Sequence, residues 1–319
     1  MRKRPGMFIG NPRSRHGVVA LVNELFANVA DLFMVGKATR FSVRCDRDRW
    51  VTVIDDGPGL PFDQWDENFG MTMLEKHVSV GHDKPTADDH VPHVHMSSLG
   101  IGLITIGAYS EELEIESCRG GVRYRQRFGR GVVLSEATKE PISAPDGSQF
   151  RFLPDPEIFG DFSKLDFLVL RARMFTAAHL FPGLVIEVQD ERFCAPGGMG
   201  AYVETLVAAE THGDGNALRF SGSTELCRID FACGGRRAKG NPTWIQSWAN
   251  GIQTTEGGTH VTGMKRALAR AGVEPGIAAL NVILDSPSFG SPTKSKLVVR
   301  GLDSDVEKAL NQFFKELSG

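Results

Sequence analysis

The spacing of apolar residues near the start of the chain predicts one helix followed by a pair of strands. In residues 17–33 apolar side chains recur every three or four positions and form a single stripe, the pattern of an amphipathic helix. Residues 41–45 and 50–54 are short runs rich in β-branched and aromatic side chains, with charged turn residues between them. These two runs predict a β-hairpin.

The pattern that follows predicts a loop, a second helix and several strands. Residues 61–98 have no clean period and carry several histidines and acids, so we expect a long loop, or lid. Residues 103–109 are apolar and follow the turn Gly100-Ile101-Gly102, which favours a buried helix. Four later runs have the composition of strands: residues 113–117, 122–128, 149–153 and 184–188. This part is predicted to be α+β, with helices on a mainly antiparallel sheet.

Length and composition together predict a second, smaller domain. At 319 residues the chain exceeds the usual size of one hydrophobic core. A helix over residues 201–209 is followed by a polar stretch, so we place the boundary there, with domains at 1–209 and 210–319. Later runs predict strands at 226–232, 243–249 and 277–284, a helix capped by Thr259 that ends near Gly272, and a final helix at 304–317. The strand, helix and strand around Thr259 indicate a βαβ unit in an α/β domain.

Composition and charge leave the partner open. The chain is 41% hydrophobic and 24% charged, with a formal net charge of -3, so it has no global attraction to nucleic acid or to an anionic membrane. It has neither a signal-peptide pattern nor an unbroken apolar run long enough to span a bilayer, and we expect a cytoplasmic protein without membrane contact. The five cysteines are scattered, which favours reduced thiols over disulfides or a zinc site.

Three clusters of residues carry candidate chemistry. Glu24, Asn28 and Asp31 share one face of the first predicted helix, where a carboxylate could activate water and an amide oxygen could bind Mg²⁺; a solvated polar face has the same spacing. The run from Asp55 to Gly59 ends a strand, and is either an ordinary Asp-Gly turn or a buried carboxylate that accepts a proton from adenine.

The third cluster is the turn Gly100-Ile101-Gly102 at a helix start, where backbone amides favour phosphate. It is not a Walker loop, because no Gly-Lys-Ser/Thr follows. Each cluster alone is weak, whereas the three in this order are far more specific for a nucleotide site.

Several motifs make the sequence resemble the gyrase, Hsp90, histidine-kinase and MutL superfamily of ATPases, and within it the B subunits of DNA gyrase and topoisomerase IV. The matching segments are residues 2–10 (RKRPGMFIG), 21–28 (LVNELFAN), 53–61 (VIDDGPGLP), 147–159 (GSQFRFLPDPEIF), 257–260 (GGTH) and 289–297 (FGSPTKSKL). The resemblance implies a Bergerat-type ATPase sandwich followed by a transducer domain, with ATP and Mg²⁺ as cofactors. It extends almost from end to end of the chain.

The resemblance also implies a role for individual residues. Glu24 would be the general base and Asn28 the Mg²⁺ ligand. Asp55 would bind the adenine amine, with Gly59 and Ser148 beside it. The phosphates would be bound at Gly100, Ile101 and Gly102, and Lys294 would contact the γ-phosphate.

The sequence departs from the family pattern at several points. Because the sequence begins at the Arg2 motif and ends after the segment that resembles the transducer, we expect a protein without the arm that exchanges between subunits in the family and without DNA-cleavage domains. Pro292 replaces a glutamine, and Ser97 and Ser98 alter the glycine-rich lid motif. The lid histidines His82, His90, His93 and His95 fit a polar loop better than a zinc site.

Two functions therefore compete at the level of sequence. The first is an ATP-hydrolysing, energy-coupling module that works with a separate DNA-cleavage subunit or another protein, with DNA as an optional partner. The second is an ATP-gated conformational switch or chaperone-like scaffold that acts on a protein and not on DNA. For either function we expect a monomer or weak homodimer without nucleotide, and ATP could promote dimerisation.

Overall fold

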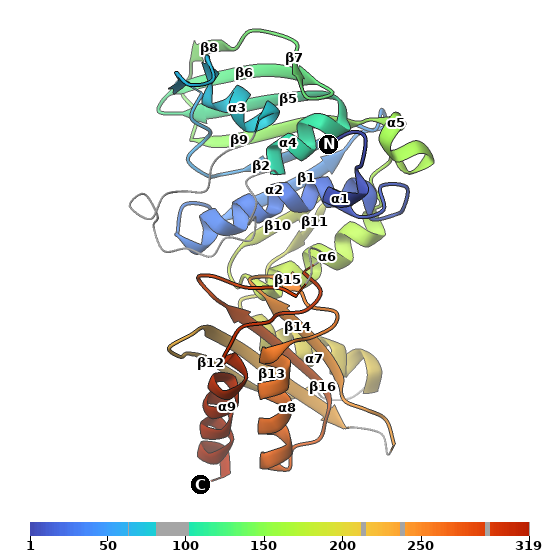
Figure 1. The fold of residues 1–319 in the computed structure, drawn as a ribbon, viewed down its shortest axis with the longest axis vertical. Coiled ribbons are helices and arrows are strands. Elements are labelled where there is room, and N and C mark those ends of the chain that lie inside the picture. Colours follow the sequence, from blue (N-terminus) through green and yellow to red (C-terminus); the bar gives the residue numbers. More distant parts are fainter. Residues whose placement is uncertain (63, 81–101, 212–214, 237–239, 291–293, 319) are drawn as a thin grey trace. The chain divides into compact units, whose positions relative to one another are not determined.

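A computed structural model describes residues 1–62, 64–80, 102–211, 215–236, 240–290 and 294–318. The chain forms two compact units, Met1–Phe175 with Gly183–Cys194, and Thr176–Pro182 with Ala195–Gly319 (Figure 1). The helix α6 (Phe167–Leu180) runs through the first point of division. The main division lies near residue 195, whereas the sequence analysis placed it after 209. The difference arises from α7 (Gly198–Thr211), which contacts the sheet of the second unit.

The first unit is built on a mixed, mostly antiparallel sheet. The strand order is β11-β10-β1-β2-β9-β5-β6-β7, and β8 pairs with β6; only the β1 and β10 pair is parallel. The bounds are β1 Arg40–Cys45, β2 Val51–Asp55, β5 Ser110–Arg119, β6 Val122–Gly129, β7 Val132–Val133, β8 Thr138–Pro141, β9 Gly147–Pro154, β10 Val185–Val188 and β11 Glu191–Phe193. The predicted hairpin is β1 and β2, and the four later predicted strands are β5, β6, β9 and β10.

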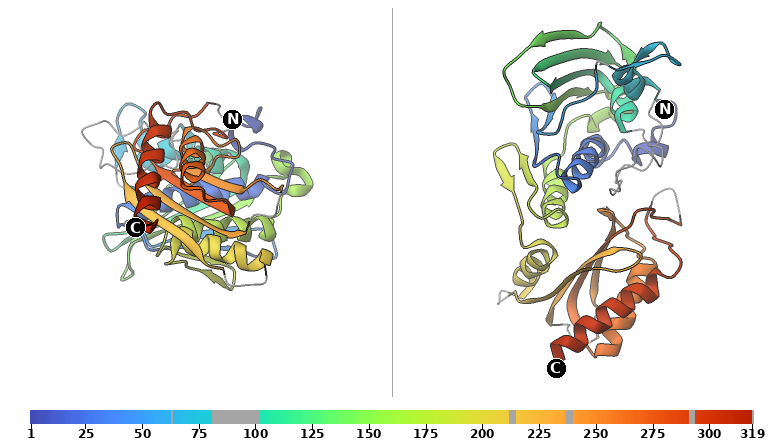
Figure 2. Two further views of the ribbon diagram at one scale, coloured as in Figure 1. Left: turned by 90° about the horizontal axis from the view of Figure 1, so that it is seen from below. Right: turned by 90° about the vertical axis from the view of Figure 1, so that its left-hand side faces the viewer.

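Helices α2 (Gly17–Met34), α3 (Met73–Ser79) and α4 (Gly102–Tyr109) lie on one face of this sheet (Figures 1 and 2). The apolar stripe of α2 is buried, and Phe26 contacts Phe41 of β1 edge to face at 5.2 Å between ring centroids. By length and composition α2 could also span a membrane, yet 56% of it is buried within the fold. Burial and the packing against the sheet fit a core helix.

The expectation of a loop across residues 61–98 was wrong for its described part. A small hairpin, β3 (Trp65–Asp66) with β4 (Met71–Thr72), leads into α3. Thr72 and Glu75 form a capping box in which each side chain accepts a hydrogen bond from the other residue's backbone. Leu74 and Val78 are fully buried one turn apart, so capping and burial together stabilise a helix too short to show a clear period.

The opposite face of the sheet is covered by ion pairs. Glutamates of β5 form ion pairs with arginines of the neighbouring strands β6 and β9, such as Glu116 with Arg125 at 2.7 Å and Glu114 with Arg151 at 3.0 Å. Arg151 also lies over the Trp50 ring at 4.0 Å. Because exposed pairs each contribute about 0 to 1 kcal/mol, this layer keeps the face solvated and adds little to stability.

The second unit has a five-stranded sheet between helices. The strand order is β12-β13-β16-β14-β15, with β14 and β16 parallel and joined through α8, so the predicted βαβ unit is present. The bounds are β12 Ala217–Ser223, β13 Arg228–Arg236, β14 Trp244–Ala249, β15 Ile252–Gln253, α8 Thr259–Ala271, β16 Pro275–Ile283 and α9 Leu302–Ser318.

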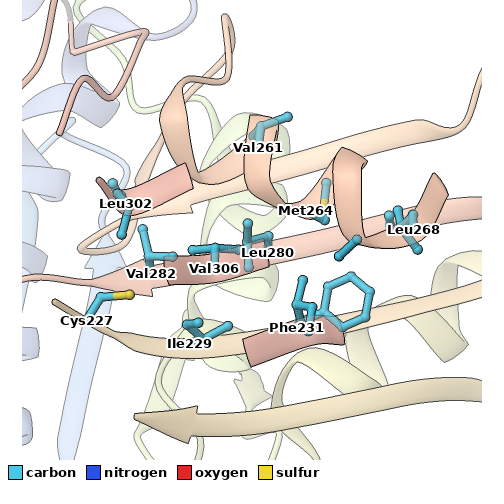
Figure 3. Packing of buried hydrophobic residues seen from close by; sticks show 14 of the residues in the cluster. Cys227, Ile229, Phe231, Val261, Met264, Leu268, Leu280, Val282, Leu302 and Val306 are labelled. Atoms are coloured by element: carbon cyan, nitrogen blue, oxygen red, sulfur yellow. The ribbon is translucent and has the colours of Figure 1, made fainter. Parts of the chain in front are cut away.

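The core of this unit lies between the sheet and the pair α8 and α9 (Figure 3). Ile229 and Phe231 of β13 pair with Val282 and Leu280 of β16, and all four belong to the buried core. Met264 of α8 packs in the same core. Side chains on the other face meet α7, where Trp248 packs edge to face against Tyr202 at 5.5 Å. Each face of the sheet is therefore covered by helix.

An ion-paired carboxylate holds the N-terminal motif against the first unit. Asp155 is fully buried, caps the helix α5 (Pro156–Phe159) through the Glu157 backbone N–H, and pairs with Arg2 at 2.7 Å and Arg130 at 2.9 Å. Arg2 also donates to the carbonyl of Ala108 in α4. Burial acts to raise the pKa of Asp155, but these hydrogen bonds and the Arg2 charge outweigh it and lower that pKa. The short helix α1 (Gly6–Ile9) follows this anchor.

Replacing Asp155 with Asn should destabilise the fold at neutral pH by about 2 to 3 kcal/mol, because two arginines lose their buried partner. The lowered pKa means that the charged form stabilises the fold at neutral pH, and this contribution is lost as pH falls through the folded pKa. Urea unfolding from pH 7 into the acid range measures both effects, with the exposed Glu157→Gln as control. Equal losses in the two variants would contradict the anchoring role.

Candidate nucleotide site

A row of polar side chains crosses the sheet of the first unit at the end of β2. Asp55 of β2 pairs directly with Ser148 of β9, and Ser148 pairs with Ser117 of β5. Directly paired residues place their side chains on the same face of a sheet. Phe41 pairs with Asp55 from the other side and contacts α2, so the whole row lies on the face that the helices cover.

Asp55 is the buried acid of this row, with 7% of its surface exposed. Its Oδ1 accepts the backbone N–H of Gly57 at 2.9 Å, and Ser148 donates further hydrogen bonds to it. Burial raises the pKa of Asp55 to about 6, and the charge of Asp56 adds to this, against the effect of the hydrogen bonds. The fold therefore holds a carboxylate whose hydrogen bonds only partly offset its loss of water.

The next residue, Asp56, has the opposite environment. Its side chain is exposed and accepts hydrogen bonds at 2.8 Å from the backbone N–H groups of Thr39 and Arg40. Partial burial acts to raise the pKa of Asp56, but a hydrogen bond from the Thr39 hydroxyl and those from the two backbone N–H groups outweigh it and lower that pKa. Of the two adjacent acids, Asp56 is thus satisfied by the fold and Asp55 remains the candidate for a ligand.

Gly59 holds the turn after β2 against β5. Its φ is +72°, and a Cβ there would lie 2.5 Å from the carbonyl oxygen of Cys118 and 2.8 Å from Ser117 Oγ. Ser117 Oγ accepts the Leu60 N–H at 2.7 Å. Glycine is required by this close approach of two backbone segments and by the left-handed conformation. The structure thus gives Gly59 a packing role beside Asp55, in addition to any role toward a ring.

Glu24 and Asn28 are partly buried and lie one turn apart on α2. The neighbouring Asn23 has a buried Oδ1 without a hydrogen-bond partner. Within the described residues no group of three His, Cys, Asp or Glu could hold a metal ion.

The glycine turn that the sequence predicts to bind phosphate is only partly described. Gly102 is buried and begins α4. Gly100 and Ile101 lie outside the described residues, as do Ser97, Ser98, the four lid histidines and Pro292. Lys294 belongs to the second unit, is partly buried, and has a left-handed backbone with φ of 56°.

Ser117 and Asn23 were missed by the sequence analysis. Ser117 lies in β5 at a position where alternation calls for an inward-facing residue, so a small polar side chain there was a readable signal. Asn23 directly follows the buried Val22 within α2, and nothing in its spacing distinguishes it from a surface residue.

The sequence matches known proteins of one family. The model of the DNA gyrase B family matches residues 198–274. The gyrase B protein of Treponema pallidum is 30% identical over 356 residues, covering 100% of this chain and 55% of that protein. The gyrase B protein of Haloferax volcanii is 31% identical over 354 residues, covering 99% of this chain and 54% of that protein. The chain resembles the ATPase and transducer region of gyrase B.

Solved structures agree with this resemblance. The 43K ATPase domain of Thermus thermophilus gyrase B, in complex with an aminocoumarin, matches with a TM-score of 0.79 and 26% identity, covering 99% of this chain and 88% of that one. The ATPase region of Saccharomyces cerevisiae topoisomerase II matches with a TM-score of 0.73 and 17% identity, covering 99% of this chain and 96% of that one, which shows a shared fold. The predicted α+β ATPase fold is confirmed. The chain spans about half the length of the gyrase B proteins it matches.

Replacing Asp55 with Asn should make the empty protein more stable while weakening adenine nucleotide binding. Because the folded state keeps the Asp55 proton to higher pH than the unfolded chain, its contribution to stability falls as pH rises from 3.8 to about 6. A neutral amide avoids this penalty, worth about 2 to 3 kcal/mol at pH 7. Thermal unfolding and calorimetry with ATP measure the two effects.

Asp56→Asn is the matched control for this experiment. It should destabilise the fold slightly, because the charged form of Asp56 is the favoured one, and it should leave nucleotide affinity unchanged. Unchanged ATP affinity in Asp55→Asn would remove Asp55 from the site.

Proposed function

We propose that this chain is an ATP-binding and Mg²⁺-dependent ATP-hydrolysing module that couples the energy of hydrolysis to a partner. The observation that carries the proposal is the under-solvated Asp55 carboxylate, with Ser148 and Ser117 in one row on the helix-covered face of the sheet. Similarity to gyrase B ATPase domains over nearly the whole chain supports it.

The row would recognise adenine through one directional contact. The exocyclic amine of adenine can donate to Asp55, which replaces the water that the fold has removed. Guanine has a carbonyl oxygen at the equivalent position, and two acceptors facing each other in a buried site repel. The same carboxylate would therefore favour ATP over GTP.

The remaining residues would act on the phosphates. Glu24 would take a proton from the attacking water, and Asn28 would bind Mg²⁺, which supplies charge neutralisation to the phosphates when bound. Gly100, Ile101 and Gly102 would donate backbone N–H groups to the phosphates at the start of α4. Lys294 would stabilise the negative charge that spreads over the γ-phosphate oxygens.

Replacing Glu24 with Ala should lower ATP turnover by about 10² to 10⁴-fold, the usual contribution of a general base, with nucleotide binding retained. Steady-state hydrolysis together with calorimetry separates the two quantities. Glu136→Gln, an exposed glutamate of the same unit, serves as the control and should hydrolyse ATP at the wild-type rate. Wild-type turnover in Glu24→Ala would exclude this base.

The partner and location remain part of the proposal. A separate DNA-cleavage subunit fits the similarity to gyrase B, and the charge and composition fit a cytoplasmic protein, monomeric or weakly dimeric without nucleotide.

The basic residues on and near α8 are the candidates for contact with DNA phosphates. Arg266 pairs with Asp303 at 2.8 Å and Arg270 with Glu307 at 3.2 Å on α9, while Lys265 and Arg236 are exposed. Arg237 and Lys239 lie outside the described residues.

The ion pairs of α8 favour the second function, an ATP-gated switch that acts on a protein, because arginines paired within the unit attract phosphates less strongly.

Duplex DNA distinguishes the two functions. A DNA-coupled module should hydrolyse ATP faster when DNA is added at low salt, and the stimulation should fall steeply toward physiological ionic strength, since phosphate contacts release counterions. Measuring the ATPase rate across a salt series, with and without DNA, gives the answer. A rate that does not respond to DNA at any salt concentration would leave the protein-directed switch as the function.

A further inference from the structure

The chain next to Lys294 is held between two other segments of the second unit. On one side, the Ser295 carbonyl accepts the Glu256 N–H at 2.8 Å, and Leu297 exchanges backbone hydrogen bonds with Gly257 and Thr259, both at 3.0 Å. On the other side, the N–H of Gly290 donates to the Lys296 carbonyl at 2.9 Å. Residues 295–297 thus form the middle of three adjacent segments.

Gly258 makes this close approach possible. Its φ is 140°, and a Cβ there would lie 2.1 Å from the Leu297 carbonyl oxygen and 2.7 Å from the Leu297 nitrogen. No side chain fits in that space. The segment that follows Lys294 therefore lies directly on the start of α8.

A buried chain of hydroxyl groups and a histidine fixes the supporting segment. Ser247 Oγ of β14 lies 2.7 Å from Thr254 Oγ1, which lies 3.1 Å from Nε2 of the fully buried His260. The Thr254 N–H also donates to the Ser247 carbonyl at 2.8 Å. Both ends of residues 254–260 are thereby tied to the sheet and to α8.

Thr259 has a different role from the one predicted. It does not cap α8, whose N-cap is Gly258 and has no side-chain cap. Its hydroxyl instead accepts the Val299 N–H at 3.2 Å, from the chain that continues beyond Leu297. Residues 295–299 are thus bound to the supporting segment along their length.

One contact at this place joins two side chains. Ser295 Oγ donates to Glu256 Oε1 at 2.7 Å, immediately after the left-handed Lys294. A non-glycine residue in that conformation is held by its surroundings, and such positions concentrate at functional sites. The backbone bonds fix where the segment lies, while the Glu256 and Ser295 contact restrains the residue that adjoins the lysine.

We propose that Glu256, through Ser295, is the positioning residue for Lys294, and that the buried Ser247, Thr254 and His260 chain is the rigid support of that contact. The inference rests on the proposed function, because it gives Lys294 its role at the γ-phosphate. Glu256 itself touches no substrate. It acts by limiting the directions available to the lysine, and small misplacements of a catalytic group are costly.

The experiment is a double-mutant cycle in the full chain. Glu256→Ala and Ser295→Ala should each lower kcat by about tenfold with KM changed less than about twofold, since the ground-state site stays intact. The double variant should fall no further than either single one, because both remove the same contact. Glu256→Gln keeps an acceptor oxygen and should restore most of the activity. Glu225→Ala, an exposed glutamate of the same unit, should match wild type.

Two further measurements separate positioning from structure and from the proposed function. The rate of backbone amide hydrogen exchange over residues 294–299 should rise in Glu256→Ala and Ser295→Ala. The unfolding midpoints of these variants should equal that of the control Glu225→Ala. Lys294→Ala in parallel tests the lysine itself. If Lys294→Ala keeps full turnover, the proposed role of Lys294 fails and positioning fails with it. If Lys294→Ala is impaired while Glu256→Ala and Ser295→Ala are not, or if the two losses multiply, only the positioning role is overturned.

Discussion

The first unit depends on keeping a carboxylate where water can hardly reach it. Asp55 ends β2 beneath the helices, and the hydrogen bonds it receives from Gly57 and Ser148 do not offset its lost hydration. The neighbouring segments are arranged around this residue. β9 and β5 supply serines in the same row, and Gly59 brings the following turn against β5. The fold tolerates the cost because the apolar face of α2 and the sheet beneath it are packed.

The two units treat their polar groups differently. In the first unit the row leaves hydrogen-bonding capacity open at Asp55, as expected where a ligand is to complete it. In the second unit Ser247, Thr254 and the Nε2 of His260 form a buried chain of hydrogen bonds, while the buried Nδ1 of His260 has no partner among the described residues. Burial lowers the pKa of His260 to about 4, so its ring is neutral and suited to a fixed hydrogen bond.

The sequence was informative where a period or a motif was long enough. The stripe of α2, the hairpin of β1 and β2, and the βαβ unit around α8 followed from spacing, and Asp55 and Ser148 do lie side by side. The row with Ser117 did not follow, because it depends on strand register between segments far apart in the chain. The helix α3 was missed because a long polar stretch hid a capping box and two buried residues. The predicted boundary after residue 209 and the division near residue 195 differ by α7, whose contacts with the sheet of the second unit depend on segments far along the chain.

The adjacent glycines of the supporting segment differ in the reason for their presence. Gly257 has a φ of 69°, and the atoms nearest to a Cβ there would be those of the Val261 side chain at 3.4 to 3.5 Å, an ordinary van der Waals distance, so the restriction at this position is one of torsion. Asparagine, which enters the left-handed region more readily than other side chains, could stand there. Gly258 is restricted by space, because the Leu297 backbone occupies the place of any Cβ. Substitution is therefore tolerated at Gly257 by a residue such as asparagine, whereas Gly258 tolerates no side chain.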